Sequence, residues 1–237
     1  FKSLIRQSQQ NQTLKGRAKG SRKMRGNSLR FIILFTPLIL AGPQFVCAAG
    51  AEDGFVPMFD GKTLKGWQTT GNWIIEEGGV VTLKPRPGEE GWQRYDAYLA
   101  TERKYKDFVL DLEFKINEGG NSGVFLRIGD LRNHVKSGFE IQILDTHGKP
   151  NPTAHDCGGV IGTSAPSKSA CKPAGEWNRY IITCQGNLLK VELNGEQIQN
   201  VKLDKSAIKD RPPEGYISFQ DEAKRVWYRN VRIKELK

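Results

Sequence analysis

Residues 108–116, Phe-Val-Leu-Asp-Leu-Glu-Phe-Lys-Ile, decide the fold class of this chain. Every even-numbered position in the stretch is apolar, whereas positions 111, 113 and 115 carry charges. Successive side chains of a β-strand point to opposite faces of its sheet. The alternation therefore predicts a strand with one face in a core and the other toward solvent.

Similar short segments recur on both sides of this stretch, separated by turn residues. In 191–198, Val-Glu-Leu-Asn-Gly-Glu-Gln-Ile, the pair Asn194-Gly195 suits the positive φ angles of a type I′ hairpin turn. Only 205–209 resembles a helical turn. About eleven short strands in one unit predict an all-β sandwich or jelly roll. The other expected strands are 72–76, 80–83, 98–101, 122–128, 139–144, 178–184, 188–193, 198–203, 215–220 and 226–233.

Residues 1–48 differ from the rest of the chain in charge. They hold nine Lys and Arg and no acid, whereas residues 49–237 hold 27 Lys and Arg against 26 Asp and Glu. The overall charge of +10 therefore comes from the first 48 residues, and the remainder is close to neutral. This distribution argues against a nucleic-acid partner for the folded part.

The same first segment has the layout of a secretory signal peptide. Basic residues precede the apolar run 31–41, and small residues follow at 47–50. The run is shorter than the roughly 20 residues that a membrane span needs. We expect cleavage after Ala48, a single folded domain over 49–237, no membrane span after cleavage, and export to the periplasm or the outside of the cell. An uncleaved N-terminal anchor is the alternative.

Three cysteines follow the predicted cleavage site. Export would place them in an oxidising compartment, and an odd number allows at most one internal pair. Cys157 and Cys171 lie in loop-like segments and are the expected pair, if a bridge forms. Cys184 ends an apolar run and is expected to be a buried thiol.

The alternation of three expected strands defines a polar face. If Val124, Leu126 and Ile128 point into the core, their neighbours point away from it, and the same rule applies to 139–144 and 215–220. Aromatic, amide and charged groups on one face suit the hydroxyls and ring faces of sugars. An ordinary solvent-facing sheet is the alternative for any one residue. The residues on this face are Phe125, Arg127, Glu140, Gln142, Tyr216, Ser218 and Gln220.

The three histidines, His134, His147 and His155, flank the segment that carries Glu140. No ligand spacing matches a metal site, so no cofactor is expected, although a divalent cation is an open alternative. One of these histidines could reach the polar face as an acid or a base. Trp92, in a glycine-containing loop, is the best candidate for a sugar platform, whereas Trp67 and Trp177 are expected to be core residues.

Eight short motifs in one order resemble the 3-keto-disaccharide hydrolase family, which has a concanavalin A-like lectin/glucanase fold. The resemblance runs from about Phe55 to Leu236. It implies a concanavalin A-like jelly-roll sandwich. One position departs from the pattern, since relatives often have His where this chain has Glu222. The motifs lie at 59–67, 99–102, 105–108, 119–127, 140–145, 175–178, 193–195 and 229–234.

The resemblance also implies an activity, the hydrolysis of a glycoside whose C3 hydroxyl has become a ketone. The ketone makes the C2 proton acidic, so a base can remove it and the C1 substituent can leave by elimination before water adds. On this scheme Glu140 is the base or a cation ligand, Arg127 and Gln142 hold the ketone or enolate oxygen, and His147 or His155 is the acid. The other expected contacts to substrate hydroxyls are Asn121, Asp145, Gln220, Arg229 and Trp92.

Two other functions are alternatives to an enzymatic one. A non-catalytic carbohydrate-binding module would use the same fold and the same polar face, and an extracellular interaction domain would use the fold alone. Arg229 is also open to a second interpretation. The alternation of its segment does not place it on the polar face, so it could instead be a partner in an ion pair.

Overall fold

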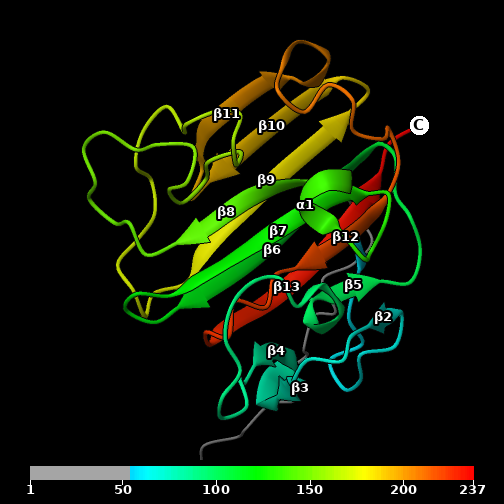
Figure 1. Cartoon of the computed structure of the whole chain (residues 1–237), viewed down its shortest axis with the longest axis vertical. Coiled ribbons are helices and arrows are strands. Elements are labelled where there is room, and N and C mark those ends of the chain that lie inside the picture. Colours follow the sequence, from blue (N-terminus) through cyan, green and yellow to red (C-terminus); the bar gives the residue numbers. More distant parts are fainter. Residues whose placement is uncertain (1–53) are drawn as a thin grey trace, which may run out of the picture. The chain divides into compact units, whose positions relative to one another are not determined.

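The computed structural model describes residues 54–237, which form two antiparallel β-sheets packed face to face. The leader, Cys47 and the predicted cleavage site after Ala48 lie outside the described residues. Figure 1 looks onto the smaller sheet, with the larger sheet behind it. The prediction of an all-β, concanavalin A-like jelly-roll sandwich is confirmed. No helix within 54–237 is long and apolar enough to cross a membrane.

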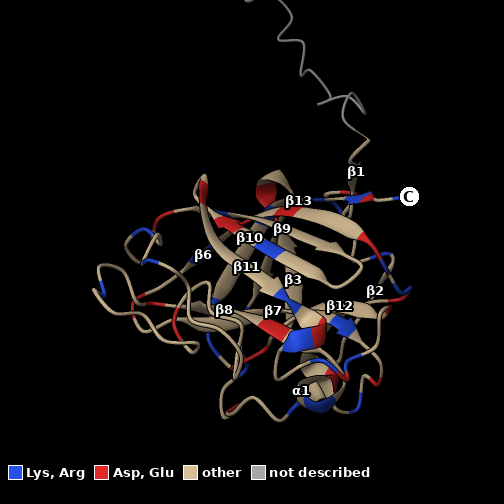
Figure 2. Ribbon diagram, turned by 90° about the horizontal axis from the view of Figure 1, so that it is seen from above, with Lys and Arg blue, Asp and Glu red and all other residues tan. Residues whose placement is uncertain are grey.

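The smaller sheet has five strands, and its central strands carry most of the predicted polar face. A one-turn helix, α1 (His134–Ser137), and the 3₁₀ turn η3 (Tyr95–Ala97) belong to the connections around this sheet. Both views show α1 on the side of the smaller sheet that faces away from the larger one (Figures 1 and 2). In spatial order the strands are β2 (Trp67–Gln68), β5 (Leu99–Thr101), β12 (Tyr216–Phe219), β7 (Asn121–Ile128) and β8 (Phe139–Leu144).

The larger sheet has eight strands and contains the stretch that decided the fold class, which is β6. The short strand β1 (Val56–Pro57) pairs with β13 (Val226–Glu235) outside the main path. The 3₁₀ turns η2 (Glu77–Gly79) and η4 (Leu203–Lys205) lie in its connections. The main path runs β11 (Glu196–Lys202), β10 (Leu188–Leu193), β9 (Asn178–Gln185), β6 (Phe108–Ile116), β13, β4 (Val80–Leu83) and β3 (Trp73–Glu76).

The core between the sheets follows the predicted alternation. Phe108, Leu110, Leu112 and Phe114 are fully buried in the main apolar cluster. The hairpin turn between β10 and β11 is also as predicted, with φ of 55° at Asn194 and 85° at the following glycine. The two-residue strands β1 and β2 and the helix α1 were not predicted, because each is too short to carry a periodic pattern.

The cysteines agree with the sequence in two respects. The Cys184 side chain is fully buried, and the three thiols within 54–237 are free. The thiols of Cys157 and Cys171 lie in hydrogen-bonding contact, and this contact lowers the pKa of Cys171. The two thiols are therefore neighbours, and a bridge between them stays a prediction.

Candidate active site

The outer face of the smaller sheet brings Glu140 and Gln142 together, as the alternation predicted. Both lie on β8, and Phe125 of β7 is directly opposite Glu140. Ser218 of β12 lies on the other side of Phe125, so the three side chains form a row across the sheet. This face is not open to solvent, because Glu140 and Gln142 are each only 7% exposed.

Glycine at position 123 makes room for the Glu140 carboxyl group. A Cβ atom on Gly123 would lie 2.0 Å from Oε1 of Glu140, so any other residue would have to displace the carboxyl group. Gly123 is opposite Gln142 on one side, and its carbonyl accepts a hydrogen bond of 2.9 Å from the backbone N–H of Gln220 on the other. The Glu140 carboxyl group therefore lies over the backbone of β7, between two amide-bearing positions.

Burial changes the acid–base behaviour of this carboxyl group. Loss of solvent raises the pKa of Glu140 from 4.5 to about 8, and the charge of Glu222 contributes further. Burial also raises the pKa of Glu222, against the opposing charge of Lys224. Oε1 of Glu140 has no hydrogen-bond partner within 54–237. Two coupled acids with raised pKa values form a site that can both accept and donate a proton near neutral pH.

Buried polar atoms without partners are concentrated around this carboxyl group. Of the eleven residues that carry such atoms within the described part, eight lie on this face or on the segments beside it. A buried polar group that lacks a hydrogen bond costs about 1–3 kcal/mol, so a group of them needs an explanation such as a catalytic role or a bound ligand, ion or water. The eight are Arg94, Asn121, His134, Glu140, Ser218, Gln220, Asp221 and Glu222.

The loop between β4 and β5 borders the site, and an ion pair between Arg94 and Asp221 connects the loop to it. Nη2 of Arg94 lies 2.7 Å from Oδ1 of the buried Asp221, and its other terminal nitrogen lies 3.4 Å from Glu89. Trp92, the predicted sugar platform, belongs to this loop and is 37% exposed. Its carbonyl accepts a hydrogen bond of 2.8 Å from the hydroxyl of Tyr98. The structure thus places Trp92 beside the aromatic side chains of the polar face.

His134 lies in this aromatic cluster, although the sequence did not single it out from the other histidines. It is the first residue of α1 and is fully buried against Tyr95, Tyr98 and Phe125, at ring-centroid distances of 5.3, 4.8 and 5.7 Å. Burial lowers its pKa to about 4, so the ring is neutral at physiological pH. The only sequence signal was its position between the two strands that carry Phe125 and Glu140.

The structure contradicts the expectation that His147 or His155 reaches Glu140. Both are exposed, and Nδ1 of His147 is 2.7 Å from the carbonyl oxygen of Cys171. The loop that follows His155 and leads to β9 runs along the edge of β8. Its residues 158, 159 and 161 form backbone hydrogen bonds with Glu140 and Gln142. This long loop therefore extends the sheet sideways and does not fold over its polar face.

The placement of Arg127 on the polar face was also wrong. Arg127 has a φ of 49°, and the pairing of β7 with β12 shifts register at this point. The irregularity reverses the alternation, so Ile128 joins the outer cluster with Phe125. The Arg127 guanidinium instead donates to the carbonyls of Lys106 and Gly186 and pairs with Asp107, which makes it structural.

Two further predicted substrate contacts lie elsewhere. Arg229 is on the outer face of the larger sheet, where its Nε donates to Glu113 at 2.7 Å, so the ion-pair interpretation is the one that the structure supports. Oδ2 of Asp145 accepts a hydrogen bond of 2.9 Å from the backbone of Gly119 and so holds the turn between β6 and β7. Asn121, Gln142 and Gln220 remain on the predicted face. No group of three or more His, Cys, Asp or Glu side chains within 54–237 is arranged to hold a metal ion.

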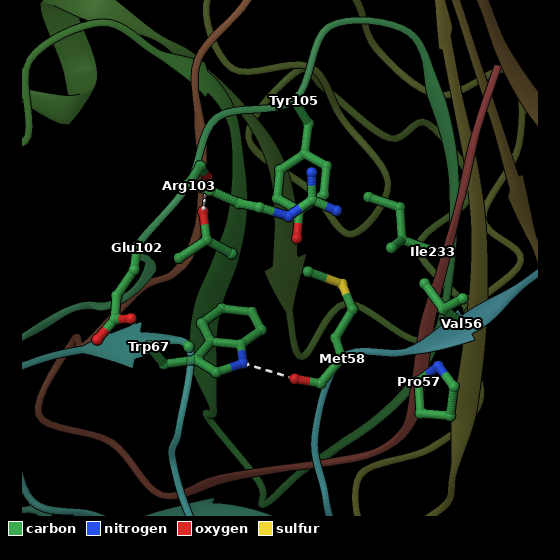
Figure 3. A pocket seen from close by; sticks show the side chains of 10 residues that line it. Val56, Pro57, Met58, Trp67, Glu102, Arg103, Tyr105 and Ile233 are labelled. Carbon is green, nitrogen blue, oxygen red and sulfur yellow. Dashed lines mark hydrogen bonds between the residues drawn. The ribbon is translucent and has the colours of Figure 1, made fainter. Parts of the chain in front are cut away.

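Three surface hollows lie away from Glu140. One, of about 310 Å³, is lined by Met58, Trp67, Arg103 and Tyr105 (Figure 3). There the Trp67 indole donates a hydrogen bond of 2.8 Å to the carbonyl of Met58, and the indole is 94% buried in the core, as predicted for this residue. A second is a shallow hollow beside His147. The third lies on the larger sheet and is described below.

Comparison with known proteins agrees with this architecture. A protein of Bacteroides thetaiotaomicron named 3-keto-disaccharide hydrolase is 27% identical over 237 residues, a match that covers 78% of this chain and 79% of that protein. The crystal structure of a candidate glycosyl hydrolase from Parabacteroides distasonis is 27% identical, with a TM-score of 0.65 over 77% of this chain and 99% of that one.

A more distant structure shares the fold alone. It is a Bacillus subtilis protein of unknown function with a galectin-like fold, 14% identical, with a TM-score of 0.50 over 73% of this chain and 90% of that one. The model of a single family matches residues 54–234, which is nearly all of the described part. The chain belongs to this family, that of the 3-keto-alpha-glucoside-1,2-lyase-like domain.

Proposed function

We propose that this protein cleaves the glycosidic bond of 3-keto-disaccharides or 3-keto-glycosides by elimination across C1 and C2, with Glu140 as the base. The observation that carries the proposal is the Glu140 carboxyl group, buried over Gly123 with an unpartnered oxygen and a pKa raised to about 8. The family description, which names a 1,2-lyase, and the name of the Bacteroides relative support the same chemistry.

The reaction divides into two balanced steps. In the first, Glu140 takes the proton from C2, the electron pair forms the C1–C2 double bond, and the C1–O bond breaks. The departing oxygen takes up a proton, so the products are an alcohol and an unsaturated keto-sugar. In the second, water adds across the double bond and gives the free 3-keto-sugar. The ketone at C3 is essential because it spreads the negative charge that develops when the C2 proton leaves.

The remaining groups of the site divide between charge stabilisation and proton supply. The side-chain amides of Gln142 and Gln220 flank the carboxyl group and can donate hydrogen bonds to the C3 oxygen. Neutral His134 can donate through one ring nitrogen in the same way. Glu222, which is half-buried and electrostatically coupled to Glu140, is the acid that we assign to the leaving oxygen. This assignment replaces the exposed His147 and His155.

The test is to incubate the purified protein with a 3-keto-disaccharide and, separately, with its unoxidised parent. In D₂O, elimination followed by hydration places deuterium at C2 of the released keto-sugar, which proton NMR detects. We expect cleavage of the keto-sugar with label at C2 and no cleavage of the parent. Cleavage of both sugars without label would contradict elimination. A parallel reaction with chelator tests whether a divalent cation takes part.

A binding module with the same polar face is the alternative function. It predicts saturable binding of the keto-sugar without any product, and Glu222, which departs from the pattern that the family resemblance implied, gives this outcome a physical basis. We also propose that the protein is exported, which the sequence before residue 49 suggests. Sequencing the N-terminus of protein recovered outside the cytoplasm tests this proposal.

A further inference from the structure

The outer face of the larger sheet contains a hollow of about 560 Å³, on the opposite side of the sandwich from Glu140. Strands β4, β6, β9 and β13 form its floor, and the first described residues and η2 form its walls. Its volume is in the range of small-molecule sites, which run from about 300 to 1,000 Å³. Nothing in the proposed reaction uses these residues.

An irregularity in β13 builds the polar floor of this hollow. The pairing of β13 with β6 shifts register between Arg229 and Arg232, and Asn230 there has a φ of 52°, which is unusual for a residue with a side chain. Strict alternation would send residues 229 and 230 to opposite faces. The bulge sends both outward, so that Nε of Arg229 and Nδ2 of Asn230 donate to the two oxygens of Glu113, at 2.7 and 3.0 Å. Bulges that re-aim side chains in this way are frequent beside binding sites.

A second carboxylate in the floor of the hollow, that of Asp111, forms ion pairs with two arginines. Asp111 is 4% exposed and accepts hydrogen bonds from Arg179 at 2.8 and 2.7 Å and from Arg232 at 2.9 Å. Each guanidinium has five N–H donors, of which two are used in such a pair. The remaining donors of these arginines and the side-chain amide of Asn230 line the hollow.

The walls combine glycine backbone with one aromatic ring. Gly61, Gly78 and Gly79 present bare backbone, and a Cβ atom on Gly79 would lie 3.1 Å from the Cα of Gly61. Phe55 lies at the other side, with the Arg232 guanidinium 4.7 Å from its ring centroid. An aromatic ring next to rigid donors and an amide is a combination that can bind the ring face and the hydroxyls of a pyranose.

We infer that this hollow is a second, non-catalytic site for a neutral oligosaccharide. We take the ligand to be neutral because the ion pairs nearly balance the charge of the floor: Asp111 and Glu113 pair with Arg179, Arg229 and Arg232, so the hollow lacks the strong positive charge that favours an acidic glycan. Sugar hydroxyls need only the unused N–H groups and the amide of Asn230. The site would hold a glycan chain on the side of the domain opposite the polar face that carries Glu140.

The test is an NMR titration of the ¹⁵N-labelled protein with maltohexaose and with cellohexaose. We expect saturable shifts of Asn230, Gly79 and the Arg179 side chain, with a Kd in the millimolar range or below. Asn230→Gly removes the amide and suits the positive φ, so the variant should fold and bind about fivefold or more weakly. Phe55→Ala, at a half-buried position, should weaken binding similarly.

Two variants serve as controls. Glu140→Gln should leave this affinity unchanged, because the two sites lie on opposite faces. Lys190→Ala, on the same outer face in β10 but outside the hollow, should also leave it unchanged. The inference is overturned if neither oligosaccharide shifts these residues at about 10 mM, or if folded Asn230→Gly binds as tightly as the parent. Tighter binding of hexagalacturonate, an acidic oligomer, would overturn the assignment to neutral sugars.

Discussion

Each outer face of the sandwich carries a buried carboxylate within one of its strands, Glu140 on one face and Asp111 on the other, and the two acids behave in opposite ways. Little of either side chain reaches solvent, since Glu140 on the smaller sheet is 7% exposed and Asp111 on the larger sheet is 4% exposed, although Glu140 lies under more protein. Burial raises the pKa of both, but hydrogen bonds from Arg179 and Arg232 outweigh it at Asp111 and leave that pKa below its ordinary value. Among residues 54–237 no cation pairs with Glu140, and its pKa is raised to about 8.

The difference separates an acid that supports the fold from an acid that is available for chemistry. A buried carboxylate that is fully paired stays ionised and contributes to stability, whereas an unpaired one costs free energy while it stays charged. Such a cost is tolerated where a raised pKa serves proton transfer. The strands on both faces show the same alternating sequence pattern. What distinguishes the two acids is therefore the presence or absence of an ion pair with arginine.

The largest expected effect follows from removing the proton acceptor of the smaller-sheet face. Glu140→Gln keeps the shape of the side chain but cannot take a proton from C2. Turnover of a 3-keto-disaccharide should fall by about 100-fold or more, the usual scale for loss of a general base. Steady-state kinetics on the keto-sugar measure this loss, and binding of the intact sugar should change less.

The control for this variant is Glu192→Gln, which removes a carboxylate from β10 in the other sheet. It should leave turnover unchanged. If Glu140→Gln retained full activity, Glu140 would not be the base, and Glu222 would be the next residue to test.

A second large effect should come from Gly123. Gly123→Ala places a methyl group where the Glu140 carboxyl group lies, since the added Cβ would be 2.0 Å from Oε1. A displacement of about 1 Å in a catalytic group can cost about 100-fold in rate, and crowding a packed site costs about 1–3 kcal/mol in the free energy of unfolding. Kinetics and urea unfolding of the same variant measure both. Full activity in a folded Gly123→Ala protein would show that the carboxyl position is not critical.

The same carboxylate-to-amide change should affect stability differently on the two faces. Asp111→Asn removes charge-assisted hydrogen bonds to two arginines and should lower the free energy of unfolding by about 1–3 kcal/mol. Glu140→Gln removes an unpaired buried charge and should be neutral or stabilising at pH 8 and above. Urea unfolding of both variants at one pH tests the contrast, and equal losses for the two would contradict it.

The pH dependence of stability sharpens this contrast. Between pH 4.5 and about 8 the folded protein keeps the Glu140 proton that the unfolded chain has released, so the free energy of unfolding falls as pH rises through this window. Asp111 has the opposite sign, because its lowered pKa adds stability above its ordinary pKa of 3.8 that is lost as pH falls. Urea unfolding at several pH values should show that the free energy of unfolding falls less steeply toward pH 8 in Glu140→Gln than in the parent protein. An equally steep fall in both proteins would argue against the raised pKa of Glu140.

The strands and the polar face could be predicted from sequence because both depend on alternation. The apolar positions of 108–116 and the outward positions of Glu140 and Gln142 follow from a period of two residues. Arg127 could not be placed in this way, since its positive φ reverses the alternation, and the bulge at Asn230 has the same effect on Arg229. A local change of one residue in register leaves no periodic signal.

His134 shows a different limit of the sequence. Its role depends on packing against Tyr95 and Tyr98, which are about 40 residues earlier in the chain. No local pattern distinguishes it from His147, whose ring instead contacts a loop carbonyl. Tertiary contacts of this kind are available only from the structure or from an alignment of relatives.

The smallest expected effect concerns the rim of the polar face, where Trp92 is compared with Trp227 of the larger sheet. Trp92 is 37% exposed on the loop that Arg94 fastens to Asp221, whereas the ring of Trp227 lies between Lys115 and Arg225 at 4.6 and 4.7 Å. If Trp92 stacks on the substrate, Trp92→Ala removes a contact worth about 0.5–1.5 kcal/mol, so KM should rise about 3- to 10-fold with kcat nearly unchanged. Trp227→Ala should leave KM unchanged because Trp227 belongs to β13 of the larger sheet, outside the polar face that carries Glu140. Equal changes in KM for the two variants would mean that the rim of the smaller sheet does not bind the sugar, and that Trp92 only covers the edge of the aromatic cluster around His134.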